Sequence, residues 1–178
     1  MELNIIAEIT DETFGKESVE FKDPIIRHGA RGIVEREDGK IAIFYKTKKN
    51  EYKLPGGGMD EGESPEDAFK REVLEETGCI VKDIEMLGLT KELKSLGNFK
   101  QISYVFYAKV ENMTKELNLT EKEKEEGSEI LWLTKEDALT RITECVEKLK
   151  ESKFDSIYST KFMNYRDREI LKYYINNK

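Results

Sequence analysis

The residues with the clearest chemical potential are one arginine and three glutamates, at Arg71, Glu72, Glu75 and Glu76. Placed on a helix over residues 65–77 at about 100° per residue, the three carboxylates share one arc of about 100°. Carboxylates at this spacing repel one another, so the arrangement calls for a cation that neutralises them. Carboxylate oxygens favour Mg²⁺, Mn²⁺ or Ca²⁺. The spacing therefore predicts a divalent metal site on one face of a helix.

The segment around these glutamates carries the signals that would position them. Ser64 and Pro65, with an acid at Asp67, are typical of a helix start, and Gly78 is typical of a helix end. The glycines at 56–58 precede this helix and let backbone groups approach a ligand or metal, because no Cβ is in the way. The sequence thus predicts a glycine-rich loop that works together with the helix.

The rest of the chain predicts strands mixed with further helices. Apolar runs on both sides of Asp38 and Gly39 predict a β-hairpin. The charged residues 114–128 predict an exposed loop or a short helix. Together these elements indicate an α/β (α+β) sandwich. The other expected elements are strands at 2–9, 17–22, 52–54, 80–89, 101–110 and 130–133, a helix from 135, a linker over 152–160 and a last helix over 164–175.

Length and composition narrow the class of protein. The chain has 178 residues, which fits one domain, and its net charge of −7 argues against nucleic acid as a partner. No run approaches about 18 apolar residues, so no membrane span is expected. The first residues lack the pattern of a signal peptide, and Cys79 and Cys145 are isolated, so a reduced, cytoplasmic protein is expected. One histidine and two cysteines exclude the usual His/Cys zinc site.

The segment from Gly57 to Cys79 resembles the Nudix box, GX5EX7REUXEEXGU, of bacterial-type Nudix hydrolases. Every fixed letter of the box matches, and the one mild departure is Cys79 at a position that is usually aliphatic. The preceding residues 54–57 and the run 132–139 also resemble the family, so the resemblance spans about residues 25–140. It implies a single Nudix-type α/β/α sandwich with a mixed β-sheet over 1–178. In this division, strands occupy about 1–24, the Nudix core 25–140 and a helical extension 141–178.

The resemblance also implies a reaction. Nudix enzymes act on phosphoric anhydride bonds, and they cleave a nucleoside diphosphate linked to another moiety with the help of Mg²⁺ or Mn²⁺. Arg71 would orient Glu75 or Glu76 by a charge-assisted hydrogen bond. The implied metal ligands are Glu72, Glu75, Glu76 and the carbonyl of Gly56, and the residues that brace the loop and helix are Gly57, Glu63 and Gly78.

The general base has two candidate sources. In some members of the family it is the helix glutamate that corresponds to Glu72. In others it comes from a loop before the last core strand, where this chain offers Glu125, Glu126 and Glu129. Glu126 is the loop residue to which we assign a catalytic role, beside Glu72, Glu75 and Arg71.

The substrate prediction rests on which family signatures are absent from the sequence. Family signatures for NADH, ADP-ribose, dinucleoside polyphosphates and coenzyme A are not found, which leaves a nucleoside triphosphate or a related nucleotide as the small-molecule substrate. Candidates for stacking on its base are Phe44, Tyr45, Tyr52, Phe99, Tyr104 and Phe106.

Two other functions remain open. The first is a nucleotide-binding or sensing domain without catalysis, which the complete set of box glutamates disfavours. The second is an RNA 5′-pyrophosphohydrolase, which would need a basic groove near the box helix, built from Lys46, Lys48, Lys49, Lys91 and Lys94. An apolar stripe over residues 170–175 could pack on the core or form a homodimer.

Overall fold

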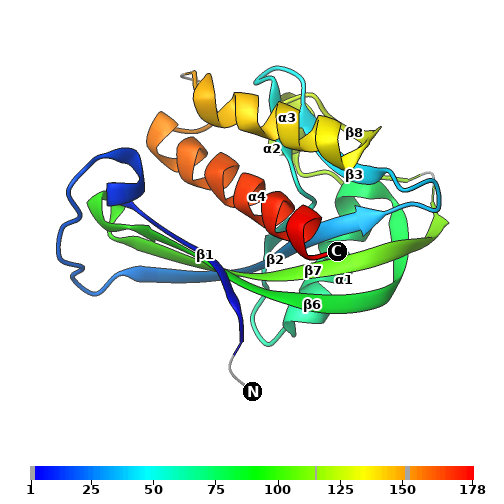
Figure 1. The fold of residues 1–178 in the computed structure, drawn as a ribbon, viewed down its shortest axis with the longest axis horizontal. Helices are drawn as coiled ribbons and strands as arrows, with labels where there is room; N and C mark the ends of the chain where they lie inside the picture. The colour runs from blue at the N-terminus through cyan, green and yellow to red at the C-terminus, as the bar shows by residue number, and fades with distance from the viewer. Residues whose placement is uncertain (1–2, 115, 151–152) are drawn as a thin grey trace.

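The computed structural model describes residues 3–114, 116–150 and 153–178 (Figure 1). The strands are β1 (Ile5–Thr10), β2 (Ile25–Glu35), β3 (Ile41–Lys46), β4 (Glu51–Lys53), β5 (Gly56–Gly58), β6 (Cys79–Lys94), β7 (Phe99–Met113) and β8 (Ser128–Leu133). The helices are α1 (Pro65–Thr77), α2 (Glu121–Glu125), α3 (Lys135–Glu147) and α4 (Ile157–Asn177), with 3₁₀ turns η1 (Asp11–Phe14) and η2 (Ser95–Gly97). None of the helices in the described ranges is long and apolar enough to span a membrane.

One mixed sheet organises the chain. Its strand order is β1-β6-β7-β2-β3-β4, with β5 paired to β2 and β8 paired to β3. β6 and β7 form a long antiparallel hairpin, whereas β1 pairs with β6 and β2 pairs with β7 in parallel. The α/β (α+β) sandwich with a mixed sheet is therefore confirmed.

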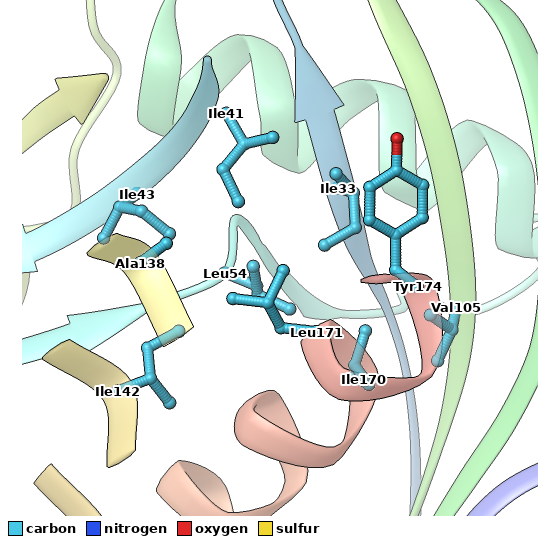
Figure 2. Packing of buried hydrophobic residues seen from close by; sticks show 10 residues of the cluster. All are labelled: Ile33, Ile41, Ile43, Leu54, Val105, Ala138, Ile142, Ile170, Leu171 and Tyr174. Carbon is cyan, nitrogen blue, oxygen red and sulfur yellow. The ribbon is translucent and has the colours of Figure 1, made fainter. Parts of the chain in front are cut away.

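Helices cover both faces of this sheet, each over its own hydrophobic cluster. Figure 1 shows α3 and α4 side by side in front of the sheet and α1 behind it. Successive residues of a strand point to opposite faces, so Ile33 of β2 packs under α3 and α4 while Val34 packs under α1. In the front cluster, Ile170, Leu171 and Tyr174 of α4 are buried against the sheet, as Figure 2 shows. The apolar stripe of the last helix thus packs on the core.

The sheet opens between β2 and β3, and this opening positions the glycine-rich strand. The two strands form a hairpin, as predicted, but their backbones pair only at Glu35 and Ile41. β5 then lies along β2, where Gly56 pairs with Arg31 and Gly58 pairs with Gly29. The glycines at 56–58 are therefore held in a defined extended conformation beside α1.

Local signals place α1 as predicted. The Ser64 side chain accepts a hydrogen bond from the backbone N–H of Asp67, and Pro65 occupies the first turn. Gly78 ends the helix in the left-handed conformation, with φ of 69°. Phe69 and Val73 are fully buried against the sheet, and the neighbouring arc of the helix carries the glutamates, of which Glu76 is buried as well.

Four predicted elements are absent or differ in extent. Residues 17–22 form no strand, because backbone N–H groups there donate to side chains, from Val19 to Ser95 and from Lys22 to Asn98. β6 and β7 are longer than expected because they pair along most of their lengths. The last helix starts at Ile157, within the predicted 152–160 linker, because Ser156 caps it. Residues 1–2, 115 and 151–152, which fall in other predicted segments, lie outside the described ranges.

Candidate active site

The glutamates of α1 and the glycines of β5 line one cavity of about 680 Å³. Gly56, Gly57 and Gly58 form one wall, and Glu72, Glu75 and Glu76 project from α1 onto it. Most other lining residues are charged, and they come from β2, β3, β4, β6, α2 and α4. The arrangement brings the predicted metal ligands to one hollow of the surface.

Gly57 allows the closest approach between β5 and α1. A Cβ built on Gly57 would lie 2.4 Å from the carboxylate carbon of Glu72, which is too close for any real contact. Gly56 adopts φ of 140° and a Cβ there would lie 2.3 Å from the carbonyl oxygen of Ala30. Both positions therefore require glycine, the first for the carboxylate and the second for the backbone.

Glu76 is the most deeply buried of the three glutamates, with 3% of its surface exposed. Its Oε2 accepts a hydrogen bond of 2.9 Å from the backbone N–H of Gly56. Burial raises the pKa of Glu76, although the nearby charge of Lys53 opposes the rise. The negative charge of this carboxylate is therefore only partly compensated by the protein.

Arg71 connects the helix to the loop before it. Its Nε and Nη2 donate to the two carboxylate oxygens of Glu63 at 2.8 and 2.9 Å, and Nη2 also donates to the carbonyl of Gly58 at 2.9 Å. Its Nη1 donates to Glu72 at 2.9 Å and to Glu75 at 3.3 Å. The Arg71 guanidinium lowers the pKa of Glu63 to about 2. Arg71 thus contacts Glu75, one of the two residues it was expected to orient.

The donor set fits a hard divalent cation. Three carboxylates and a backbone carbonyl are oxygen ligands of the kind that Mg²⁺ and Mn²⁺ prefer. Among the described residues no three acidic, histidine or cysteine side chains form a ready cluster, because Arg71 engages Glu72 and Glu75 while Glu76 turns to Gly56. Burial raises the pKa of Glu72 as well as that of Glu76. A cation between them would supply the compensation that the protein lacks.

Comparison with known proteins decides the family. The sequence model of the NUDIX domain matches residues 26–155, which is most of the chain. The chain belongs to the NUDIX domain family. It is accordingly a hydrolase that acts on pyrophosphate bonds.

Two curated relatives of this Nudix protein carry different names and match different lengths of the chain. A MutT-like protein of Streptomyces ambofaciens is 29% identical over 121 residues, which cover 68% of this chain and 72% of that protein. An RNA pyrophosphohydrolase of a Sulfurovum species is 55% identical over 53 residues, which cover 29% of this chain and 32% of that protein. The match spans about a third of the length of the RNA pyrophosphohydrolases.

Two solved structures match this chain over part of its length. A structural study of MutT from Aliivibrio salmonicida and Vibrio cholerae gives a TM-score of 0.44 at 20% identity and covers 68% of this chain and 82% of that one. The Bacillus subtilis pyrophosphohydrolase BsRppH gives a TM-score of 0.45 at 27% identity and covers 56% of this chain and 60% of that one.

The acidic loop before β8 contributes two glutamates to the Nudix cavity. Glu126 is fully buried and forms an ion pair of 2.5 Å with Lys46. Glu123, which sequence reasoning did not single out, lines the same cavity as the box glutamates, and its Oε2 accepts hydrogen bonds from the backbone N–H and the hydroxyl of Thr120. The other two acids of this loop that were considered, Glu125 and Glu129, are exposed and do not line the cavity.

The five lysines considered for an RNA-binding groove do not come together. Lys46 and Lys94 line the cavity beside the box helix. Lys48 and Lys49 line a second, smaller hollow of about 230 Å³, next to α3 and α4, although the Nζ of Lys49 also lies 2.8 Å from Asp155 of the first cavity. Lys91 lies 3.8 Å from Glu8 of the edge strand β1. The structure therefore divides these lysines among three places.

Other cations that line the cavity were missed from the sequence. Arg27 and Arg31 come from β2, Lys53 from β4 and Arg166 from α4. No local spacing relates these residues to the box, because strand pairing and helix packing bring them together. Phe99, one of the predicted base-stacking residues, also lines the cavity.

Proposed function

We propose that this chain is a divalent-metal-dependent Nudix pyrophosphohydrolase that cleaves a nucleoside diphosphate linked to another moiety. A nucleoside triphosphate or a related nucleotide is the simplest such substrate. The observation that carries the proposal is the shared cavity, where three box glutamates lie beside a glycine-rich strand and several cationic side chains. Carboxylates suit a metal, and arginine and lysine suit the phosphates that the metal would engage.

In this proposal Glu72, Glu75, Glu76 and the carbonyl of Gly56 hold Mg²⁺ or Mn²⁺. When bound, the metal neutralises phosphate charge and lowers the pKa of a water molecule, which becomes the nucleophile. Arg71 is a positioning residue, because its Nη1 holds Glu72 and Glu75 together.

Three further residues keep the loop and the helix in register. Gly57 leaves space for the carboxylate of Glu72. Glu63 links Arg71 to the loop, because its Oε2 accepts a hydrogen bond of 2.9 Å from the backbone N–H of Asp60. Gly78 ends α1 and accepts, through its carbonyl, a hydrogen bond from the backbone N–H of Thr114 at 2.7 Å. We assign these residues a structural role in catalysis rather than contact with substrate.

The proton of the attacking water needs an acceptor, and α2 offers one. Glu123 lines the same cavity as Glu72 and Glu76. Among the described residues its carboxylate is bonded only to the backbone N–H and hydroxyl of Thr120 and not to a cation, so it can accept a proton there. Glu126, the residue selected from the sequence, lines the same cavity but is held by Lys46. We therefore place Glu123 first and Glu126 second as general base.

The experiment that tests this function is a substrate screen in Mg²⁺ or Mn²⁺. The panel contains nucleoside triphosphates, nucleotide sugars, ADP-ribose, NADH, dinucleoside polyphosphates and 5′-triphosphorylated RNA, with chromatography of the products. Cleavage that releases a nucleoside monophosphate, stops in EDTA and returns with added metal supports the proposal. Binding of a nucleotide, seen as a higher melting temperature, without any cleavage would favour the sensing domain instead.

RNA 5′ ends are the second candidate substrate. The observation that favours them is the 55% identity with a relative named RNA pyrophosphohydrolase, although this identity covers 29% of the chain. Of the five lysines expected to form a basic groove, only Lys46 and Lys94 line the cavity, where they lie with Arg27, Arg31, Lys53 and Arg166. In the screen, preference for triphosphorylated RNA over free nucleoside triphosphates would make this candidate the function.

A further inference from the structure

The last helix forms one wall of the cavity, although it lies beyond the part of the chain that matches the family. The family match ends at residue 155, and α4 begins at Ile157. Tyr158, Met163 and Arg166 of this helix nevertheless line the same cavity as the box glutamates. This wall of the cavity therefore comes from a helix outside the segment that the family model matches.

Arg166 sits in a buried network of charges. Its Nη1 lies 2.7 Å from Oε2 of Glu92, and its Nε lies 2.8 Å from Oδ1 of Asp167. Nη1 of Arg31 of β2 lies 3.9 Å from the same Oδ1 of Asp167, and Nζ of Lys94 lies 3.1 Å from Oε1 of Glu92. All five residues are more than nine-tenths buried, so water does little to stabilise their charges.

The network carries more positive than negative charge. Arg31, Lys94 and Arg166 are cations, whereas Glu92 and Asp167 are the carboxylates that contact them. Burial, and next to it the charge of Arg166, lower the pKa of Arg31 to about 10. A buried excess of positive charge is unfavourable unless an anion joins it.

Two guanidinium nitrogens of this network also lack acceptors. Within the described residues, Nη2 of Arg166 and Nη1 of Arg31 are buried and have no hydrogen-bond partner. Both residues line the cavity. Buried N–H groups are nearly always hydrogen-bonded in proteins, so these two are placed for a ligand that brings acceptor oxygens.

The network lies directly behind the proposed metal site. Oδ2 of Asp167 accepts a hydrogen bond of 3.0 Å from the backbone N–H of Leu54, two residues before Gly56. A Cβ on Gly56 would lie 2.4 Å from the Cβ of Arg31. A phosphate chain that starts at the box glutamates can therefore reach the guanidinium groups without leaving the cavity.

We propose that Arg31 and Arg166 bind a phosphate group of the substrate beyond the two that lie at the box glutamates. This inference rests on the proposed function and makes it more specific, because it selects substrates with at least three consecutive phosphates. Guanidinium groups match phosphate oxygens in both charge and geometry. Lys53 lines the same cavity and forms no ion pair among the described residues, although its charge also acts on Glu76, so we include it as the third cation for this phosphate. A neutral base edge would leave the excess charge uncompensated.

The direct test is binding of inorganic phosphate chains without metal. Calorimetric titration in EDTA compares tripolyphosphate with pyrophosphate, which is one phosphate shorter. The expected result is at least about tenfold tighter binding of tripolyphosphate by the natural chain. Equal affinity for the two anions, or no binding of tripolyphosphate, would overturn the inference. Because this test involves no hydrolysis, its result is independent of the proposed reaction.

Variants locate the effect. Arg166→Lys keeps the positive charge but loses the paired N–H donors of the guanidinium group. Lys53→Met removes a cation that forms no ion pair among the described residues, although its charge acts on Glu76. Each is expected to weaken tripolyphosphate binding about tenfold and to leave pyrophosphate binding nearly as in the natural chain. Lys40→Met, at the exposed turn between β2 and β3, is the matched control and should change neither. Equal effects of Lys53→Met and Lys40→Met would contradict the site.

Kinetics separate the failure of this inference from failure of the proposed function. If no member of the substrate panel is cleaved, the proposed function fails, whereas the titration still decides the phosphate site. If substrates are cleaved, Lys53→Met should raise the KM for nucleoside triphosphates about tenfold more than the KM for ADP-ribose, which has two phosphates. An equal rise for both substrates would overturn the inference and leave the pyrophosphohydrolase in place.

Discussion

Gly57 and Glu72 approach each other so closely that a single added methyl group on the glycine would occupy the place of the carboxylate, at 2.4 Å from its carbon. The contact joins the glycine-rich strand to the box helix. It explains in steric terms why a glycine is needed at the first position of the box. Gly57 leaves space for the Glu72 side chain, whereas its neighbour Gly56 leaves space for the backbone of Ala30.

Gly57→Ala should abolish most activity while the protein stays folded. The new Cβ meets the far end of a flexible side chain, so Glu72 moves and the fold accommodates the change. A displacement of about 1 Å at a catalytic group costs about 100-fold in rate. The measurement is kcat together with the melting temperature of the purified variant.

Gly56→Ala is the matched comparison. Here the Cβ meets the backbone of Ala30 at 2.3 Å, and φ of 140° disfavours any side chain. This variant should therefore lose stability as well as activity, seen as a lower melting temperature. Similar melting temperatures for the two variants would contradict the steric assignment.

Glu123→Gln should lower kcat by about 100-fold, because a general base contributes about this much to a rate. Glu125→Gln, at the exposed neighbour on α2, is the control and should leave kcat unchanged. Glu126→Gln removes the partner of Lys46 and should affect the melting temperature more than kcat. A larger loss of kcat in Glu126→Gln than in Glu123→Gln would assign the base to Glu126.

The buried carboxylate of Glu92 should make stability sensitive to acid. Burial alone would raise its pKa, but Arg166 and Lys94 lower the pKa to about 2, below the ordinary value of 4.5. Because the folded chain binds this proton more weakly than the unfolded chain, the contribution of Glu92 is present above pH 4.5 and is lost as the pH falls toward 2.

Thermal unfolding of the natural chain and of Glu92→Gln between pH 7 and pH 2 measures this contribution. The variant leaves Arg166 without one of its carboxylates, so it should be less stable at pH 7 by about 3–5 kcal/mol. The difference between the two proteins should shrink as the pH falls. A constant difference over the whole range would show that Glu92 is not the titrating group.

The first turns of α4 should be needed for the fold itself. Phe162 is fully buried and packs edge to face on Phe14 and on Tyr158, with ring centroids 4.9 and 5.3 Å apart. Phe162→Ala should lower the free energy of unfolding by about 3–5 kcal/mol. Leu117→Ala, at a side chain that is 44% exposed, is the control and should change it by less than about 0.5 kcal/mol. Denaturant titration measures both, and equal effects would mean that α4 docks weakly.

The parts of the site that could be predicted from the sequence are those with local signals. The cap at Ser64, the end at Gly78 and the helical spacing of the glutamates are properties of one segment, and the structure has each of them. The hairpin around Asp38 and Gly39 and the start of α3 at Thr134 are local for the same reason.

The parts that could not be predicted depend on distant partners. Arg31 and Arg166 are 135 positions apart, and they come together because α4 packs across β2 and β6. Phe162, on the second turn of α4, packs on Phe14 near the other end of the chain. Such long-range contacts produce no periodic pattern in the sequence, so the cavity wall that α4 forms could not be predicted from it.

The most direct test of the central claim compares Glu75→Gln with Glu61→Gln in the presence of Mg²⁺. Glu75 projects into the cavity and contacts Arg71, whereas Glu61 is exposed in the loop before α1. The measurement is kcat/KM on the best substrate of the screen, with binding of Mn²⁺ to each protein. We predict that Glu75→Gln loses at least about 100-fold in kcat/KM and binds Mn²⁺ more weakly, while Glu61→Gln matches the natural chain. A near-normal rate and Mn²⁺ affinity in Glu75→Gln would contradict the proposal that the glutamates of the box hold the catalytic metal.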